Sequence, residues 1–180
     1  MERKSGRLIT SRQLILGALL SSIAALFQSA GAFIGIGYAL SMLATLPILV
    51  AAFISIPLGV LSYMTAILLL GVLQPSELWI FPFTTGLLGL GIGIGFKVRN
   101  HWVVATSFGA IFLMLGISVV LYGFSYPILG PISSSFSIVV LLGILGFSFF
   151  YSWLWVIGGI KLRQRIQGVV KAKSKQLEAT

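Results

Sequence analysis

The chain has 180 residues, of which 58% are hydrophobic and 8% are charged, and its formal net charge is +9. This composition lies far outside the soluble range, so the positive charge does not indicate a nucleic-acid-binding domain. The chain has no cysteine, which excludes disulfides, thiol catalysis and cysteine metal sites.

The basic residues are confined to three short segments. Lysine and arginine are missing from residues 13–96 and again from residues 100–160. They occupy the N-terminal tail, a break at Lys97 and Arg99, and the C-terminal tail from Lys161. Burying an ion in hydrocarbon costs several kcal/mol, so this pattern predicts a polytopic membrane protein. Its basic segments are expected to lie against anionic lipid headgroups.

Glycine, proline and charge divide the apolar sequence into segments long enough to cross a bilayer. A hydrocarbon core roughly 30 Å thick requires about 20 apolar residues, or somewhat fewer where the bilayer thins. The first segment is interpreted as a retained helix rather than a cleaved signal peptide. In chain order, the six predicted spans are residues 13–34, 38–55, 58–73, 83–96, 102–122 and 136–160.

Six spans place both tails on one side of the membrane, together with the basic break at 97–101. The positive-inside rule makes that side cytoplasmic, whereas five spans would leave one basic cluster outside. The sequence thus predicts an all-α polytopic membrane protein with six transmembrane helices and cytoplasmic N and C termini. Its parts are a basic tail (1–12), a six-helix membrane domain (13–160) and a second basic tail (161–180).

Small residues indicate where helices approach closely, because apolar helices in lipid associate through packing rather than through hydrophobicity. Span four carries two such pairs, Gly89 with Gly93 and Gly91 with Gly95, which we assign to packing inside the bundle. In span one, Gly17, Ser21 and Ala25 form one stripe, and Ala18 and Ser22 lie beside it. For span one we favour a surface that faces a partner protein.

The residues of catalysis are scarce. The chain has no aspartate, one histidine (His101) and three glutamates (Glu2, Glu77 and Glu178). No glycine-rich phosphate loop leads into a lysine and a hydroxyl residue, so ATP hydrolysis by this chain is not expected. No carboxylate falls in mid-span, which disfavours proton-coupled transport, although sodium coupling through backbone carbonyls stays open. The sequence predicts no enzyme activity, no cofactor and no metal site.

Polar and aromatic residues gather instead at the predicted outer ends of the spans. Glu77 is the one acidic residue outside the tails. An apolar pocket with a few convergent polar groups is the usual form of a small-molecule site. The alternatives are an interfacial aromatic belt for Trp79 and a solvated loop carboxylate for Glu77. The predicted substrate-binding residues are Glu77, Trp79, Tyr38, Gln74, Tyr122 and Tyr126.

Taken together, these features resemble the substrate-binding S components of energy-coupling factor (ECF) vitamin transporters. The stretch Ala18-Leu-Leu-Ser21-Ser22-Ile-Ala24-Ala25 is similar to the small-residue docking surface of that family, with serine in place of its second alanine. Residues 46–52 with 56–59 look like its second helix and following turn, and residues 158–163 like its sixth-helix exit.

The resemblance implies a multi-pass protein of the bacterial cell membrane that captures a small water-soluble vitamin or precursor from outside. Its partners would be a transmembrane coupling protein and two ATPase subunits. Docking would use Ala18, Ser22 and Ala25.

Two other functions are compatible with the sequence: a membrane scaffold or assembly factor without transport activity, and a stand-alone small-solute transporter or channel. Thiamine or its pyrimidine precursor, pyridoxine, riboflavin, a pantothenate-like acid and an amino acid are all open as substrates. A single outer carboxylate without an outer arginine favours a neutral or cationic ligand over an anion.

Overall fold

The computed structural model describes residues 10–32, 36–124 and 138–178, and within these ranges its regular elements are all helical. The longer helices are α1 (Ser11–Ser29), α3 (Thr45–Ile54), α4 (Ile56–Leu73), α5 (Thr85–Val98), α6 (Trp102–Ser118) and α7 (Ile138–Glu178). The shorter elements are η1 (Ala30–Ala32), α2 (Ile36–Met42), η2 (Pro75–Trp79), η3 (Phe81–Phe83) and η4 (Val119–Gly123).

Within the described residues, five segments are helical, long and apolar enough to cross a membrane. They are Ser11–Ser29, Ile56–Leu73, Pro75–Val98, Trp102–Gly123 and Ile138–Arg165. A sixth apolar helical segment, Ala39–Ile54, is shorter. The predicted all-helical architecture is thus confirmed, whereas a sixth crossing stays a prediction.

The predicted second span is interrupted, and its proline explains where. Pro47 has no N–H to bond to the carbonyl of Leu43, and its ring crowds that carbonyl. The amide of Leu46 bonds to the Leu43 oxygen instead, at 3.0 Å, in a tighter turn. The chain therefore forms two helices, α2 and α3, which meet at Leu43 and Ala44.

The break before the third span is confirmed. Ser55 has extended backbone, and its hydroxyl accepts a hydrogen bond from the amide of Leu58, which caps α4. Pro57 lies in the first turn of α4. A backbone N–H there has no partner inside the helix, so the missing N–H of proline removes no hydrogen bond.

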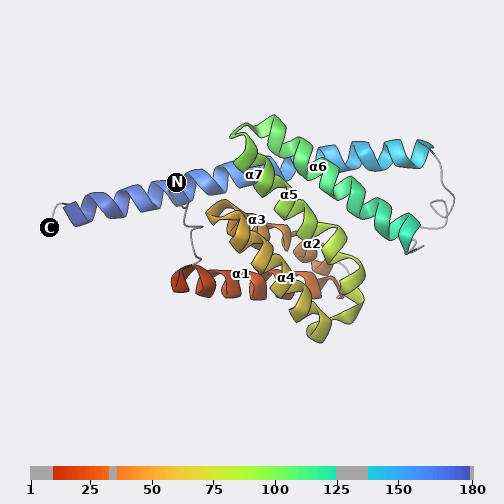
Figure 1. Cartoon of the computed structure of the whole chain (residues 1–180), viewed down its shortest axis with the longest axis horizontal. Coiled ribbons are helices and arrows are strands. Elements are labelled where there is room, and N and C mark those ends of the chain that lie inside the picture. The colour runs from red at the N-terminus through yellow and green to blue at the C-terminus, as the bar shows by residue number, and fades with distance from the viewer. Residues whose placement is uncertain (1–9, 33–35, 125–137, 179–180) are drawn as a thin grey trace, which may run out of the picture.

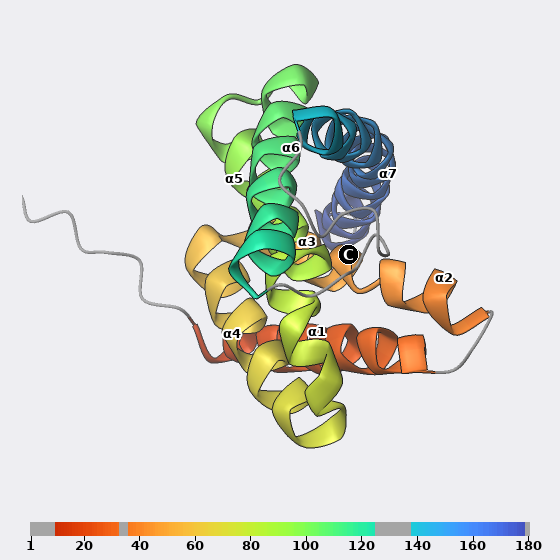
Figure 2. The ribbon, with the colours of Figure 1, turned by 90° about the vertical axis from the view of Figure 1, so that its right-hand side faces the viewer.

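Helix α3 lies between two groups of helices (Figures 1 and 2). On one side α3 packs against α1 and α4. On the other side it packs against α5, which packs against α6, and α6 packs in turn against α7. Two clusters of buried side chains result. The first involves α1, α3, α4 and α5, and the second lies mainly among α5, α6 and α7.

The glycines of α5 allow its backbone to approach helices on two sides. A methyl group on Gly89 would lie 2.8 Å from the carbonyl oxygen of Thr45, and one on Gly93 would overlap the side chain of Ala52, both in α3. On the other side, methyl groups on Gly91 and Gly95 would meet Phe112 and Ala105 of α6, at 2.9 and 2.6 Å. The predicted packing of both glycine pairs inside the bundle is confirmed.

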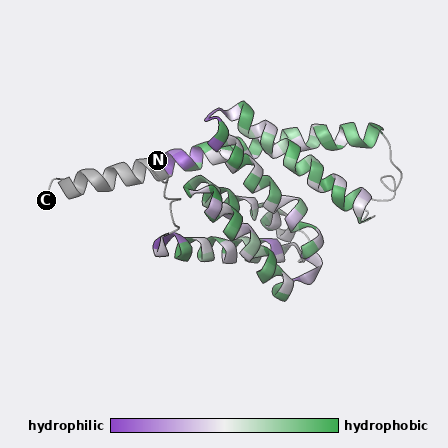
Figure 3. Cartoon of the chain, in the orientation of Figure 1, coloured by the Kyte–Doolittle hydropathy of each residue, from purple (hydrophilic) through white to green (hydrophobic). Residues whose placement is uncertain are grey.

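The basic residues of the described ranges gather at one end of the bundle. Arg163 of α7 donates a hydrogen bond of 2.7 Å to Asn100 in the break between α5 and α6. Its guanidinium also lies over the ring of Phe53, near the end of α3. Figure 3 shows hydrophilic segments at the start of α1, at this break and on α7 at residues 161–165.

Helix α7 is longer than the sixth predicted span. It continues through Lys161 to Glu178, although the apolar segment ends near residue 160. Lysine, arginine, glutamine and alanine all favour helix, and no proline follows to stop it. The second basic tail therefore continues α7 rather than starting a separate element.

Candidate functional site

A polar cluster lies at the end of the bundle opposite the basic residues, where α1 ends and α5 begins. Gln28, in the last turn of α1, is 2% exposed. Its side-chain Nε2 donates a 2.8 Å hydrogen bond to Oε2 of Glu77 in η2. Its Oε1 accepts a 2.8 Å hydrogen bond from the hydroxyl of Thr85 in the first turn of α5. Three elements distant in sequence are joined by this chain of bonds.

The second oxygen of Glu77 lies on the side of Gly31 and Ser41. A methyl group added to Gly31 would lie 3.5 Å from Glu77 Oε1 and 3.1 Å from the Cβ of Ser41. The glycine in η1 therefore keeps a side chain out of the space next to the carboxylate. Glu77 itself is half-buried.

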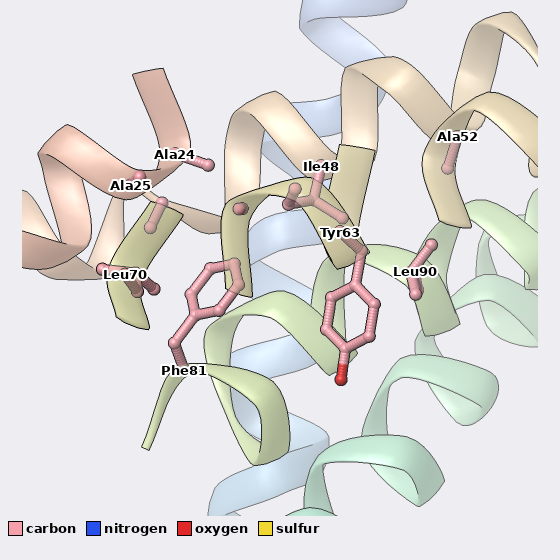
Figure 4. Close-up of a cluster of buried hydrophobic side chains, with 10 residues drawn as sticks. Ala24, Ala25, Ile48, Ala52, Tyr63, Leu70, Phe81 and Leu90 are labelled. Carbon is pink, nitrogen blue, oxygen red and sulfur yellow. The ribbon is translucent and has the colours of Figure 1, made fainter. Parts of the chain in front are cut away.

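The loop that carries Glu77 is anchored to the core. Phe81 is fully buried, and its ring stacks on that of Tyr63 in α4, with the ring centres 6.1 Å apart (Figure 4). The Tyr63 hydroxyl donates a 2.8 Å hydrogen bond to the carbonyl of Pro82. Because buried polar groups require partners, this bond fixes η3 to α4 and holds Thr85 at the start of α5.

A separate aromatic group lies beside the loop. Trp79 and Phe83 both pack edge-on against Phe124, with ring centres 5.0 and 5.5 Å apart. Trp79 is half exposed. Its ring is a surface on which an incoming ligand can stack.

The structure brings only part of the predicted site together. Glu77 belongs to the polar cluster, but Gln74 bonds instead to Ser76 of its own loop, at 3.1 Å. Tyr122 packs against the second buried cluster, away from the first. The backbone of Tyr38 lies in α2, and Tyr126 lies outside the described residues.

Two polar residues of the cluster were not predicted from sequence. Gln28 is the single amide side chain between Gln13 and Gln74, a signal that could have marked it. Thr85 follows the aromatic loop at the start of α5, and its residue type does not set it apart from the neighbouring Thr84. Their pairing depends on contacts between residues 49 and 57 positions apart.

The predicted docking residues of α1 divide between two faces. Ala18 and Ser22 are exposed, and the Ser22 hydroxyl donates to the carbonyl of Ala18 at 3.0 Å. Ala25 is fully buried in the first cluster, so it does not belong to an exposed surface. Gly17 and Ser21 are also buried, and a methyl group on Gly17 would lie 2.7 Å from Leu58 of α4. Most of this small-residue stripe therefore serves contacts inside the chain.

An apolar groove of about 670 Å³ runs between α6 and α7. It is lined by Trp102, Val103, Leu142, Leu145, Gly146, Phe149, Phe150 and Trp153. These side chains offer almost no polar group to orient a water-soluble ligand, so the groove suits hydrocarbon rather than a nutrient. Within the described ranges, no three histidine, aspartate or glutamate side chains gather where they could hold a metal ion.

No protein-family model, curated protein or solved structure matches this chain. The class defined by the fold is an all-helical protein with five helices able to span a membrane. Any narrower assignment rests on the polar cluster and on the resemblance described above.

Proposed function

We propose that this chain is the membrane-embedded binding subunit of an ATP-driven importer of the ECF type. It captures a small water-soluble vitamin or precursor from outside the cell. The observation that carries the proposal is the cluster of Gln28, Glu77 and Thr85, a polar site at the end of the bundle remote from the basic residues.

The proposed orientation follows from charge. With the basic end in the cytoplasm, as the positive-inside rule requires, the polar cluster faces outward. The second crossing is made by α2 and α3 together, since Ala39–Ile54 is apolar but short. The protein then crosses the bacterial cell membrane six times and has both termini in the cytoplasm.

A topology map tests this arrangement. We expect single cysteines introduced at Ser76 and at Asn100 of this cysteine-free chain to react from opposite sides of the membrane. A membrane-impermeant maleimide should label the Ser76→Cys variant in intact cells and the Asn100→Cys variant only after permeabilisation. Labelling of the Asn100→Cys variant in intact cells, which five spans would give, or labelling of both variants from the same side would contradict the six-span arrangement.

The energy for import is proposed to come from other polypeptides. The sequence contains no phosphate-binding loop, and its one acidic residue outside the tails lies in the polar cluster. A subunit that only binds and presents its ligand needs neither a phosphate-binding loop nor a carboxylate in mid-span for proton coupling. Its partners would be a transmembrane coupling protein and two ATPase subunits.

The exposed small residues of α1 provide the proposed docking face. Ala18 and Ser22 lie among exposed apolar side chains such as Ile15, Leu19 and Leu26. Small side chains at the centre of an apolar face let a partner helix approach closely. Ala25 is left out of this face because it is buried.

Co-purification with the importer subunits tests the function. The wild-type chain is expected to bring down a coupling protein and two ATPases, and to support ATP-dependent uptake. Ala18→Leu and Ser22→Leu should reduce both at least tenfold while ligand binding by the isolated chain is retained. Gly143→Leu is the matched control, because a Cβ atom added to Gly143 of α7 would have no neighbouring atom within 4 Å.

Three results would contradict this proposal. Normal uptake in both α1 variants would remove α1 as the docking face. Solute flux by the purified chain in liposomes, without ATPases, would identify a stand-alone transporter. A chain that binds no small molecule and no ATPase would fit a membrane scaffold.

A further inference from the structure

We propose that the polar cluster binds a cation: an organic molecule whose positively charged nitrogen pairs with the carboxylate of Glu77. This inference rests on the proposed function, since it names the chemical class of the captured nutrient. The direction of the hydrogen bonds, the missing counter-charge and the second oxygen of the carboxylate support it.

The hydrogen bonds run in one direction, toward Glu77. The Thr85 hydroxyl donates to Gln28 Oε1, and Gln28 Nε2 donates to Glu77 Oε2. A carboxylate can only accept, so an ionised Glu77 requires the amide nitrogen of Gln28 on its side. The Oε1 atom of the Gln28 amide must then accept a hydrogen bond, and the Thr85 hydroxyl donates it. The chain of donors is therefore arranged to stabilise a negative charge on Glu77.

Among the described residues, no counter-charge lies near Glu77. Lysine and arginine are missing from residues 13–96 and 100–160, which include α4 and α6, and α5 carries its one lysine, Lys97, in its last turn, at the far end from the loop. The described basic residues lie at the opposite end of the bundle, where Arg163 bonds to Asn100. An unpaired charge that is partly removed from water is costly, and an incoming cation removes that cost.

One oxygen of the Glu77 carboxylate is not used by Gln28. Glu77 Oε2 is used by Gln28, whereas Oε1 lies beside Gly31 and Ser41. Gly31 contributes no side chain there. A ligand nitrogen that reaches this side would pair with Oε1, with the side chain of Ser41 beside it.

An organic cation fits these groups better than a metal ion does. Hard cations such as Ca²⁺ or Mg²⁺ take about six or more oxygen ligands. Here the Gln28 oxygen is already bonded to Thr85, and its NH₂ group faces the carboxylate. An ammonium or a charged ring nitrogen needs only a carboxylate and a further acceptor.

Ligand binding by the purified chain and three variants tests the inference. The probes are thiamine (a cation), riboflavin (neutral) and pantothenate (an anion), together with the molecules that co-purify with the chain, identified by mass spectrometry after release. We expect the co-purifying molecule to be positively charged at neutral pH. We also expect thiamine to raise the melting temperature more than riboflavin or pantothenate does.

Glu77→Gln should reduce the affinity for the cation at least tenfold, without lowering the melting temperature of the ligand-free protein. The substituted amide can still accept from Gln28 through its oxygen, so the structure is kept while the charge is lost. Gln28→Ala should weaken binding less, because it removes a residue that only positions Glu77. Ser76→Ala is the loop control and should change neither quantity, since its hydroxyl is exposed and bonds only to Gln74.

The outcomes separate this inference from the proposed function. A neutral or anionic co-purifying molecule, or full binding by Glu77→Gln, would overturn the cation proposal and leave the importer proposal standing. Stabilisation by NaCl relative to an equal concentration of tetramethylammonium chloride, lost in Glu77→Gln, would replace the organic cation with a metal ion. Binding of no probe and of no co-purifying molecule would overturn both.

Discussion

Replacing Gly93 by alanine is expected to lower the stability of the bundle by about 1–3 kcal/mol, the usual cost of forcing extra methylene or methyl volume into a packed core. The added methyl would overlap Ala52, which is 1% exposed and is itself enclosed on a second side by Gly59 of α4. A methyl group on Gly59 would lie 2.8 Å from the Cα of Ala52. Ala52 thus marks the place where α3, α4 and α5 meet, and none of the three can move away freely.

Reversible unfolding in mixed detergent micelles measures this effect. Gly143→Ala is the matched control, because a methyl group at Gly143 of α7 has nothing within 4 Å. Exchange of glycine for alanine within a helix is favourable by about 1 kcal/mol, and both variants share that gain. The difference between them therefore isolates the packing cost at Gly93. Equal stability of the two variants would contradict the close approach of α3 and α5.

How much of this fold was predictable depends on how local each signal is. The alternating glycines of α5 predicted close packing because a glycine every fourth residue marks one helix face. The break next to Pro57 was predictable because proline ends a preceding helix but is accepted in the first turn of the next one, and the structure places it at Ser55. The break at Leu43 lies four residues before Pro47, at the carbonyl that the proline ring crowds. It was not predicted, because a proline inside an apolar span can also kink a helix without ending it.

The face of a membrane helix that meets a partner is harder to predict than its composition. Ala18, Ser22 and Ala25 were grouped as one docking surface on the resemblance to the small-residue surface of the S components. In lipid, the buried and exposed faces of a helix are both apolar, so hydropathy does not separate them. Ala25 is fully buried because it belongs to the first cluster, with side chains of α3, α4 and η3.

The candidate site shows the same division. Glu77 stood out from the sequence because it is a single carboxylate in a long apolar region. Its hydrogen bond from Gln28 depends on the end of α1 lying beside η2, which the sequence does not show. The bond from Thr85 to Gln28 likewise depends on the start of α5 lying beside α1. Trp79 and Tyr122 were expected beside Glu77 because of their depth in the membrane. Depth says nothing about direction around the bundle, and they pack in other groups.

Gly116 of α6 links the packing of the helices to the geometry of the site, and Gly116→Ala is expected to reduce ligand affinity at least tenfold. A methyl group at this position would overlap the main-chain carbonyl of Phe83 in η3, with the carbonyl carbon at 2.6 Å. A main chain cannot rotate aside as a side chain does, so η3 must shift away from α6. Thr85 follows Phe83 by two residues and donates to Gln28, so the shift disturbs the donors that orient Glu77.

Affinity and melting temperature measured on the same preparations distinguish this effect from general destabilisation. Gly123→Ala is the matched control near the same end of α6, because its methyl group would meet only Val119 Cγ1, at an ordinary 3.6 Å. Gly93→Ala serves as a second reference, since it is expected to destabilise the bundle far from Thr85. We expect Gly116→Ala to lose more affinity than Gly93→Ala at equal loss of melting temperature. If the two variants lost affinity in proportion to stability alone, η3 would not be what positions Thr85 and the carboxylate.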